Sequence, residues 1–409
     1  MNKLEKLIAK LCPNGVEYKA LGDVLFSIRT GLNPRQNFVL NEVGATNYYV
    51  TVKEFSSGKL EFSEKTDRIT NDALKIIQGR SHLEIGDVLL SGIGTIGRVT
   101  VVDIPTENFN CSESVYLLKP NPGFVGSRFL GYVLNTQGVQ SQWEKTSVGS
   151  TLKGIRKETL MKVLIPIPPL PVQEEIVRML DDMAGLIGEL EQELAVRKQQ
   201  YEWYRERLLT EKAGKYKSKK LGEIATIERG NGLAKKDFVE SGFPCIHYGQ
   251  LYTQFNTYAV QAKTFVSKEF AIELKHLHHG DVLMAVTSEN IEDVCKCIAW
   301  LGEGDVVVGG HTAIIRHQVN PKYLAYWFQT DVFFHQKRIL AHGTKVIEVT
   351  PSCLNEVLLP VPPIPVQEEI VRMLDDMAGL IGELEQEISA RKQQYEYYRD
   401  KLLTFPRAD

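Results

Sequence analysis

Three glycines lie in a stretch whose spacing could hold a nucleotide cofactor. The sequence SGIGTIGRV, residues 91–99, places Gly92, Gly94 and Gly97 as G-x-G-x-x-G. This pattern holds a pyrophosphate when it joins a strand to the N-terminus of a helix. The preceding GDVLL is typical of a strand, but the following RVTVVDIP has the β-branched alternation of a second strand. We therefore predict a glycine-rich turn between two strands, and no cofactor site.

Other motifs of catalysis or metal binding are missing from the sequence or incomplete. It contains no G-x-x-x-x-G-K-[ST] phosphate loop, no H-E-x-x-H zinc helix and no G-x-S-x-G nucleophile elbow. VNPKY, residues 319–323, is similar to the N-P-P-Y loop of amino-methyltransferases, but Lys322 replaces the second proline. One group of histidines and cysteines matches no standard zinc spacing: His276, His278, His279, Cys295 and Cys297. We predict neither catalytic residues nor a metal site.

Length and composition indicate a soluble protein of more than one domain. The chain has 409 residues, and a single core usually divides beyond roughly 250–300 residues. No apolar run approaches the ~20 residues that span a bilayer, and the N-terminal MNKLEKLIAKL lacks the apolar core of a secretory signal. The six cysteines include no C-x-x-C pair. We expect a cytoplasmic protein with reduced thiols.

An internal repeat dominates the chain. Residues 163–210 and 357–404 are identical at 39 of 48 aligned positions, with an offset of 194. The offset continues into the preceding sequence, where HLEIGDVLL (82–90) aligns with HLHHGDVLM (276–284). It places Val286, Ser288 and Ile291 where the first copy has its three glycines. Each copy is therefore a variable head followed by a nearly invariant segment, and a shared cofactor site is excluded.

The invariant segment predicts a long helix. Its proline-rich start, LIPIPPLP or LLPVPPIP, favours an extended lead into the helix. The following apolar residues have the alternating three-and-four spacing of a coiled-coil seam: Ile176, Leu180, Met183, Ile187, Leu190, Leu194, Tyr201, Tyr204 and Leu208. About 40 residues would give a rod of roughly 60 Å. We expect the two copies to form an intramolecular antiparallel coiled coil with pseudo-two-fold symmetry; the alternative is that each helix packs only on its own head.

Charge separates the helices from the heads. Residues 171–210 contain nine acidic and five basic side chains, and residues 365–404 repeat this count. Removing two segments of net charge −4 from a chain of −3 leaves +5 for the rest. Mildly basic heads with aromatic and small polar loop residues suit nucleic acid, because Lys and Arg neutralise phosphates while Asn, Gln, His and Arg read base edges.

Candidate DNA-contacting residues follow from their place in predicted loops. In the first head they are Arg29, Thr30, Ser91, Thr95, Arg98, Lys145, Ser150 and Lys153. In the second head they are Arg229, Asn231, Lys235, Lys236, His247, Tyr248, Gln250, Ser288, Asn290 and Lys345. For each of them the alternative is an ordinary solvated loop residue.

The duplicated motifs resemble the specificity subunit of type I restriction-modification enzymes. PIPPLPVQEEIVRML and PVPPIPVQEEIVRML open the two helices, RKQQYEWYRERLL and RKQQYEYYRDKLL close them, and GDVLLSGIGTIGRV and GSTLKGI are similar to framework segments of that family's target-recognition domains. The resemblance covers essentially the whole chain. It transfers no DNA-contacting residue, since those positions vary with specificity.

The resemblance implies a non-catalytic DNA-reading subunit. Each target-recognition domain would read one half of a bipartite, asymmetric sequence in double-stranded DNA, and the helices would set the gap. Two modification subunits would dock on the helices and methylate adenine N6 with S-adenosylmethionine, and restriction subunits would supply ATP- and Mg-dependent translocation and cleavage. No cofactor or membrane contact is implied for this chain.

The expected fold is α+β, with two mixed α/β target-recognition domains joined by the two long helices. We place domain 1 with an N-terminal helix at 1–165, helix 1 at 166–212, domain 2 at 213–359, helix 2 at 360–404 and a tail at 405–409. Two other function classes remain open: a coiled-coil assembly scaffold without DNA specificity, and an autonomous DNA methyltransferase or nuclease.

Overall fold

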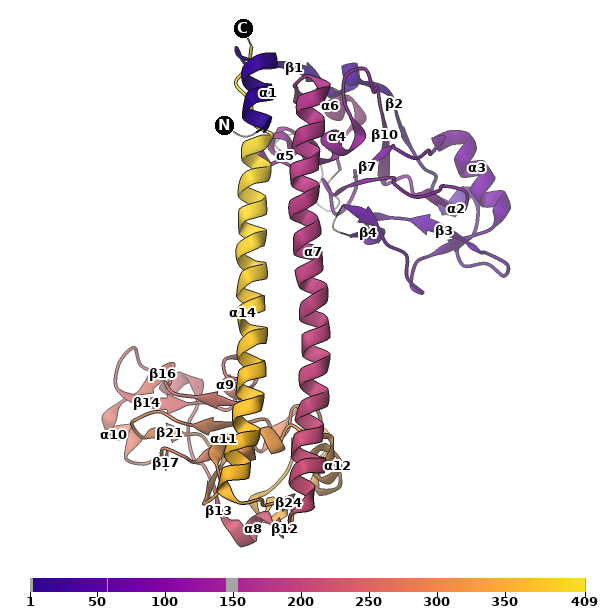
Figure 1. Cartoon of the computed structure of the whole chain (residues 1–409). Coiled ribbons are helices and arrows are strands. Elements are labelled where there is room, and N and C mark those ends of the chain that lie inside the picture. The colour runs from indigo at the N-terminus through magenta and orange to yellow at the C-terminus, as the bar shows by residue number, and fades with distance from the viewer. Residues whose placement is uncertain (1–2, 57, 145–153, 409) are drawn as a thin grey trace. The chain divides into compact units, whose positions relative to one another are not determined.

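The computed structural model describes residues 3–56, 58–144 and 154–408. They form two compact units that both draw on the two repeats (Figure 1). Unit 1 comprises residues 1–190 and 387–409, and unit 2 comprises residues 191–386. We call residues 3–167 head 1 and residues 213–360 head 2.

Head 1 is built on a four-stranded antiparallel sheet of order β2-β10-β7-β8. A second sheet, β6-β3-β9, contains the parallel pair β3–β9, and β1–β11 and β4–β5 are separate antiparallel pairs. The strands are β1 (Glu17–Ala20), β2 (Leu25–Thr30), β3 (Asn47–Val50), β4 (Phe55–Ser56), β5 (Lys59–Leu60), β6 (Arg68–Ile69), β7 (Val88–Ser91), β8 (Val99–Val101), β9 (Phe109–Cys111), β10 (Val115–Pro120) and β11 (Leu164–Ile167). The helices are α1 (Lys3–Leu11), α2 (Pro34–Asn37), α3 (Asn71–Ser81), α4 (Ser127–Leu134), α5 (Gln137–Glu144) and α6 (Lys157–Met161), with short 3₁₀ turns η1 (Leu21–Val24) and η2 (Val52–Glu54).

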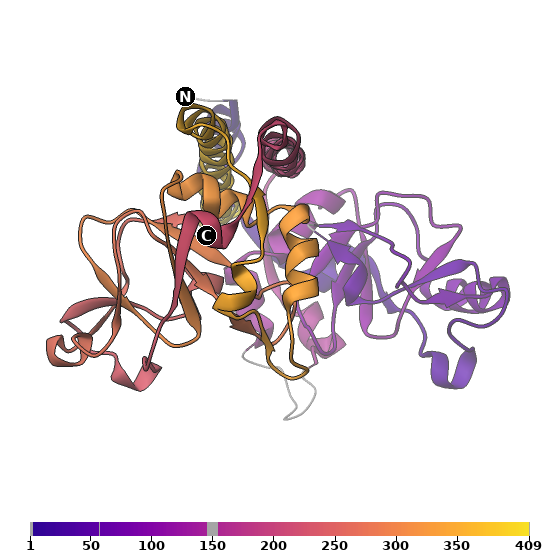
Figure 2. The same cartoon turned by 90° about the horizontal axis from the view of Figure 1, so that it is seen from below.

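Head 2 repeats this arrangement with one more strand in its main sheet. The orders are β13-β22-β18-β20-β15 and β16-β14-β21-β17, with β12–β24 and β19–β23 as separate pairs. The strands are β12 (Ser218–Lys220), β13 (Ala225–Arg229), β14 (Phe243–Ile246), β15 (Tyr258–Ala259), β16 (Thr264–Val266), β17 (Lys275–Leu277), β18 (Val282–Ala285), β19 (Thr287–Ser288), β20 (Cys297–Trp300), β21 (Val306–Val308), β22 (Thr312–His317), β23 (Ile347–Glu348) and β24 (Leu358–Pro360). The helical segments are η4 (Ala213–Lys215), α8 (Leu221–Ile224), η5 (Lys235–Asp237), α9 (Gln250–Thr253), α10 (Lys268–Ala271), α11 (Pro321–Trp327), α12 (Asp331–Leu340) and α13 (Pro351–Leu354). Strands β14, β16, β17 and β21 lie farther from the long helix α14 than α11 does (Figures 1 and 2).

The two long helices are α7 (Leu170–Arg207), which continues into a π-helical turn η3 (Leu208–Lys212), and α14 (Ile364–Leu402). Their proline-rich leads are edge strands, since β11 and β24 each lie in a two-stranded sheet, with β1 and with β12. At an edge, prolines cost no central ladder hydrogen bond. Gln173 then ties the start of α7 to head 1 by donating to the carbonyls of Pro168 and Phe124. Gln367 donates to Pro362 O in the same way at the start of α14.

Each head packs against the start of one long helix and the end of the other. In unit 1, Val172, Ile176 and Leu180 of α7 share a core with Leu403 and Phe405. In unit 2, an equivalent core contains Ile370 and Leu374 of α14 and Leu208, Leu209 and Ala213. Each helix therefore packs on its own head, as the alternative to the coiled coil had it, and also contributes to the core of the opposite head.

The helices run antiparallel within unit 2. Lys198 pairs with Glu385 at 2.6 Å, and Lys212, farther along the chain, pairs with the earlier Glu369 at 2.8 Å. These pairs and the mixed sheets confirm the predicted α+β class with antiparallel long helices. The predicted seam is partly wrong at Tyr204, which is exposed, because head 2 packs against the neighbouring face that carries Tyr201, Leu208 and Leu209.

A hydrogen-bonded chain of two tyrosines and an aspartate joins head and helices in both units. Tyr326 of α11 donates to Asp375 Oδ1 at 2.7 Å, and Tyr201 from the end of α7 hydrogen-bonds the Tyr326 hydroxyl. In unit 1, Tyr132 of α4 donates to Asp181 Oδ1 at 2.5 Å and Tyr395 of α14 hydrogen-bonds Tyr132. Burial and the aspartate together raise the pKa of both central tyrosines, which stay protonated donors.

Residues 405–408, which we predicted as part of a tail, are instead built into head 1. Phe405 is buried, its carbonyl accepts from the Tyr18 hydroxyl at 3.0 Å, and Val16 and Arg407 form a parallel bridge. Gly15 makes this approach possible, since it has φ +97° and a Cβ there would lie 2.5 Å from Pro406 O. No helix in the described part of the chain is long and apolar enough to cross a membrane.

Candidate nucleic-acid interface

Five loops of head 2 meet at the same end of its two sheets. They are residues 229–238, 247–250, 286–291, 309–311 and 342–348, and we call them the loop cluster. Backbone contacts join them: Val286 N donates to His311 O at 2.9 Å, and Thr287 pairs with Glu348 through β19–β23. Arg229 crosses between two loops, donating from Nε to Gly310 O at 2.9 Å and pairing from Nη1 with Glu348 at 2.5 Å. All ten candidate residues of head 2 lie in this cluster, with Gln250 at the end of the second loop.

Several candidates in the cluster use their polar atoms to brace the loops. Arg229 is held as described, and Asn231 donates to Glu273 O at 2.6 Å while accepting from Lys275 N at 2.8 Å. Asn290 donates to Asp293 Oδ2 at 2.8 Å and accepts from Asp293 N at 2.7 Å. Because the amide groups of both asparagines are already engaged within the head, their main role in this structure is to shape the loops.

Two candidates are not solvated loop residues at all. Gln250 is buried, and its Oε1 accepts from His247 N at 2.8 Å, so it closes the turn after β14. His247 is also buried, with its ring 4.4 Å from that of Tyr248 and its Nδ1 accepting from Gly249 N. Burial, with help from Lys235 and His311, lowers the pKa of His247, so the ring is neutral at pH 7. The expectation of an exposed position was wrong for both residues, because the chain turns back onto the sheet there.

Of the remaining candidates, the three lysines and Tyr248 present free polar groups, whereas Ser288 does not. Lys235, Lys236 and Lys345 are exposed and have no ion pair among the described residues. Tyr248 is half-buried between aromatic rings, and its hydroxyl has no hydrogen-bond partner in the described part of the chain. Ser288 is half-buried and hydrogen-bonds the Tyr252 hydroxyl.

Sequence reasoning missed His311, which lies at the centre of the cluster. Its ring is exposed, lies 4.8 Å from the Tyr248 ring and engages Thr287 Oγ1 through Nδ1 at 2.8 Å. The signal in the sequence was Gly-Gly-His between the two valine- and isoleucine-rich strands β21 and β22. A glycine pair allows the sharp link, and His311 is the first side chain after it.

In head 1 the candidates divide in the same way. Arg29 donates to Arg80 O at 3.0 Å, and Thr30 Oγ1 accepts from the Arg80 guanidinium at 3.5 Å. Ser91 is buried and its hydroxyl accepts from Arg98 N at 2.9 Å, so its predicted loop exposure was wrong: it closes the turn between β7 and β8. Thr95 and Arg98 are exposed. Three further candidates lie outside the described residues: Lys145, Ser150 and Lys153.

The glycine-rich stretch is the predicted turn between two strands. β7 and β8 pair antiparallel on either side of it, and Gly94 and Gly97 have φ of +80° and +83°. A Cβ at Gly92 would lie 2.4 Å from the Tyr116 ring. Ile93 forms a bridge to Gly154, and the residue 194 positions later, Thr287, pairs with Glu348 in the corresponding place. The turn is therefore a framework feature of both heads, although only head 1 builds it from glycines.

The two heads keep the same backbone hydrogen bonds while the side chains differ. Gly92 N donates to Ser114 O at 2.8 Å, as Val286 N donates to His311 O, so Ser114 and His311 occupy equivalent positions. Glu54 accepts from Thr51 N at 2.8 Å, in the way that Gln250 accepts from His247 N. We call this shared arrangement of strands and hydrogen bonds the frame. At these equivalent positions the frame carries hydroxyl groups in head 1 and aromatic rings in head 2.

Residues of the incomplete catalytic and metal motifs have structural roles. Asn320 caps α11 by accepting from Lys322 N and Tyr323 N, and Lys322 pairs with Asp375 at 2.6 Å. Cys295 and Cys297 are buried in the head 2 core, and burial raises the pKa of both thiols. His278 Nδ1 lies 2.8 Å from Asp305. The residues that the structure describes contain no group of three or more side chains suited to a metal ion.

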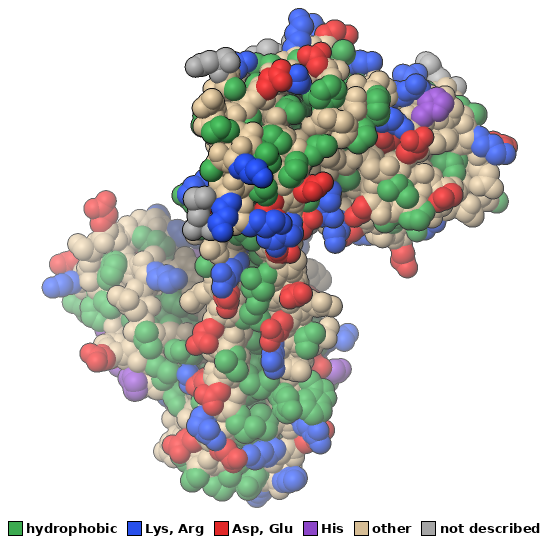
Figure 3. All heavy atoms as spheres, turned by 45° about the horizontal axis from the view of Figure 1, so that its top comes forward, with side chains coloured by type: hydrophobic (Ala, Val, Ile, Leu, Met, Phe, Trp, Pro, Cys, Tyr) green, Lys and Arg blue, Asp and Glu red, His purple; other side chains and the backbone are tan. Residues whose placement is uncertain are grey.

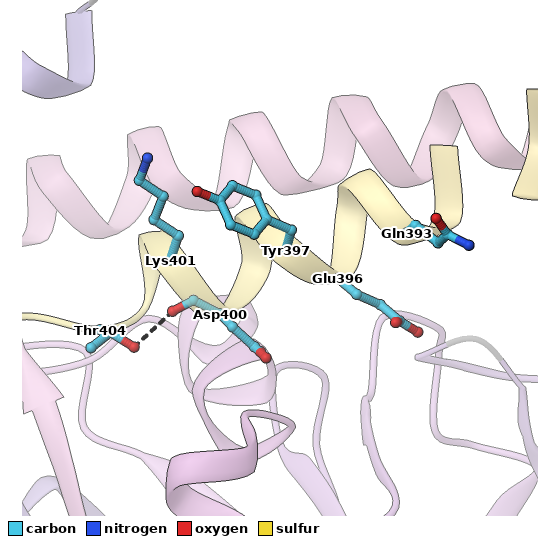
Figure 4. A pocket seen from close by; sticks show the side chains of 6 residues that line it. All are labelled: Gln393, Glu396, Tyr397, Asp400, Lys401 and Thr404. Carbon is cyan, nitrogen blue, oxygen red and sulfur yellow. Dashed lines mark hydrogen bonds between the residues drawn. The ribbon is translucent and has the colours of Figure 1, made fainter. Parts of the chain in front are cut away.

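Each long helix also carries an exposed aromatic ring beneath a cation. Arg207 lies over Trp203 at 4.9 Å, and Lys401 lies over Tyr397 at 5.6 Å, at the same positions of the repeat. A shallow groove on α14 runs along this surface, lined by Gln393, Glu396, Tyr397, Asp400, Lys401 and Thr404 (Figure 4). On the face drawn in Figure 3, charged side chains of both signs are interspersed with hydrophobic ones over the long helices.

Comparison with known families matches each head together with most of its helix. The family model of the type I restriction modification DNA specificity domain matches residues 13–196 and again residues 214–391. The chain belongs to this family.

The relatives to which the chain is similar in sequence are specificity subunits of the same family. The chain is 30% identical over 265 residues to the EcoR124I/EcoR124II specificity subunit of Escherichia coli, an alignment that covers 61% of this chain and 64% of that protein, just under two thirds. It is 24% identical over 418 residues to a putative MjaX specificity subunit of Methanocaldococcus jannaschii, covering 96% and 92% of the two chains.

Solved structures share the fold. A chain from a structure of a type I R-M system superposes with a TM-score of 0.59 at 18% identity, covering 96% of this chain and 98% of that one. The S subunit of a type I restriction-modification system from M. genitalium superposes with a TM-score of 0.52 at 14% identity, covering 95% and 96%.

Proposed function

We propose that this chain is the sequence-specific DNA-recognition subunit of a type I restriction-modification complex. Each head would read one half of a bipartite, asymmetric site in double-stranded DNA. The observation that carries the proposal is the pair of matched frames with different side chains: half-buried Ser114 in head 1 and exposed His311 in head 2 occupy one backbone position. Two different half-sites require the same backbone frame in both heads with different side chains in the loops. A scaffold without DNA specificity would not require the side chains to differ.

The long helices would set the gap between the half-sites and hold two modification subunits. The support is the duplication of the exposed aromatic–cation surface, Trp203 with Arg207 and Tyr397 with Lys401. Exposed aromatic and arginine side chains are enriched at protein interfaces. A surface present twice fits a partner that binds twice.

Catalysis would lie in the partners. We infer that modification subunits methylate adenine with S-adenosylmethionine and that restriction subunits translocate and cleave DNA with ATP and Mg, in the cytoplasm. Side chains of the incomplete motifs support that division: Asn320 caps α11, Cys295 and Cys297 are buried in the core, and His278 lies 2.8 Å from Asp305.

The test is to express this chain with its modification subunits in a host without adenine methylation and to map N6-methyladenine by single-molecule sequencing. The expected result is one motif of two short half-sites separated by a fixed unspecified gap. Methylation without such a motif would favour the scaffold alternative. Methylation or metal-dependent cleavage by the isolated chain would instead favour an autonomous enzyme.

A further inference from the structure

We propose that His311 and Tyr248 are the residues of head 2 that read bases, and that the arginine and asparagines of the loop cluster position them. This inference rests on the proposed function of the chain. It follows from an account of which polar atoms in the cluster are already engaged and which are free.

The position of His311 is fixed by its surroundings. Its carbonyl accepts from Val286 N, and Gly310, just before it, accepts from Arg229 Nε. A Cβ at Gly230 would lie 2.3 Å from Gly309 O, so the two loops cross in close contact. The exposed imidazole is therefore carried on a rigid backbone, as precise recognition requires.

One ring nitrogen of His311 is hydrogen-bonded within head 2, and the other has no hydrogen-bond partner among the described residues. Nδ1 lies 2.8 Å from Thr287 Oγ1, and Thr287 is itself held by β19–β23 and by the Tyr252 hydroxyl, which donates to its carbonyl at 2.9 Å. Nε2 has no partner among the described residues. The Thr287 contact therefore orients the ring so that Nε2 can donate to, or accept from, a group outside the protein.

Tyr248 completes the reading surface. Its ring lies between those of His247 and His311, at centroid distances of 4.4 Å and 4.8 Å. Among the described residues its hydroxyl has no partner, in contrast to that of Tyr252, which donates to Thr287 O. Two adjacent rings thus each offer one free hydrogen-bonding atom and an apolar face, and such groups suit the acceptors, donors and thymine methyl that base edges display in the major groove.

The unpaired lysines of the loop cluster would have a different role from that of the two rings. Lys235, Lys236 and Lys345 are exposed on two loops of the same loop cluster. A lysine ammonium on a flexible stem neutralises phosphate without reading sequence. The cluster is thereby divided into three groups: engaged residues that shape the loops, lysines that bind the backbone of DNA, and two rings that contact bases.

The chain itself supplies the best test variant. Ser114 occupies the position of His311 in head 1, so His311→Ser installs a residue that this frame already carries. Tyr248→Phe removes one oxygen atom and keeps the ring. His335→Gln serves as a control, because His335 is exposed on α12 and its Nδ1 contacts only Asp331 O within its own helix.

The experiment maps N6-methyladenine in complexes of the full chain with its modification subunits and measures methylation of single-mismatch sites. We expect His311→Ser and Tyr248→Phe to relax the same half-site, with about 10- to 100-fold lower discrimination at one or two positions. The other half-site and the gap should stay unchanged. Lys345→Ala should lower methylation of all sites alike, and His335→Gln should behave as the parent chain.

Three results would overturn the inference while leaving the proposed function intact: undiminished discrimination in both ring variants, a uniform loss at all sites, or relaxation of different half-sites. Should His311→Ser fail to assemble, Tyr248→Phe decides, because it leaves volume and packing almost unchanged. If the parent complex itself shows no bipartite motif, the proposed function fails and the inference fails with it.

Discussion

Replacing Phe405 by alanine should destabilise unit 1 by about 3 kcal/mol. Phe405 is 8% exposed and packs in the core that contains Leu403, Leu180 and the helix α1. Truncation of a buried phenylalanine to alanine costs about 3–5 kcal/mol, and the lower end applies here because Phe405 is not fully buried. The backbone of residues 405–408, where Arg407 forms a bridge with Val16, stays in place.

Hydrogen exchange of the intact chain measures this effect separately in the two units. Amides of β7, β8 and β10 should lose protection equivalent to about 3 kcal/mol, whereas those of β18 and β22 in unit 2 should change much less. The matched control is Tyr397→Ala, an aromatic residue of α14 that is 60% exposed, for which a change within about 0.5 kcal/mol is expected. A loss below 1 kcal/mol in Phe405→Ala, or an equal loss in Tyr397→Ala, would show that the C-terminus is a dispensable tail after all.

Three further predictions concern acid stability, the tyrosine chains and the helices. Burial lowers the pKa of His317 to about 4. Between about pH 6.5 and 4 this histidine is therefore protonated in the unfolded chain but neutral in the folded chain, so the free energy of unfolding should fall by up to about 3 kcal/mol as the pH drops through this range. Urea titrations should show a shallower fall in His317→Asn. Tyr132→Phe and Tyr326→Phe should each lower the free energy of unfolding by about 1.5–3 kcal/mol, because each leaves a carboxylate without its hydroxyl donor. If the same titrations showed a loss in only one of the two variants, the equivalence of the two units would be contradicted. Inserting four residues near Ala184, about 6 Å of helix, should lengthen the unspecified gap by one or two base pairs with both half-sites unchanged, and methylation mapping of an active complex with an unaltered gap would refute the role of the helices as a spacer.

The features that the sequence predicts well are those set by periodicity and duplication. The repeat, the proline leads, the long helices and the turn at Gly92–Gly97 follow from local patterns, and the second copy removes the ambiguity of the glycine motif. The exposure of Ser91, His247 and Gln250 could not be predicted, because it depends on which backbone groups lie beside them after folding. Residues 405–408 were predicted as part of a tail, since Val16, which forms a bridge with Arg407, is some 390 residues away in the sequence.

His311 illustrates why sequence patterns can fail to indicate a residue proposed to contact DNA while they do indicate the residues that position it. Arg229 and Asn231 attract notice as basic and amide residues in a loop, yet their hydrogen bonds end on Gly310, Glu348 and Glu273. A single histidine after two glycines has no periodic signal, and its importance appears only when the partners of its neighbours are counted. Residue type indicates what a side chain can bind, whereas the folded structure decides whether that capacity is still free.

This division of labour has a consequence for how recognition can change. The engaged residues fix loop geometry through hydrogen bonds inside the head, so replacing them costs stability before it alters any contact outside. The free rings at 248 and 311 contribute little to internal hydrogen bonding, so they can be exchanged while the frame stays folded. Head 1 already shows one such exchange, with Ser114 on the backbone position of His311. A frame built in this way allows the preferred half-site to change by substitution at a few exposed positions, while the strands, the glycine-lined crossings and the long helices remain as they are.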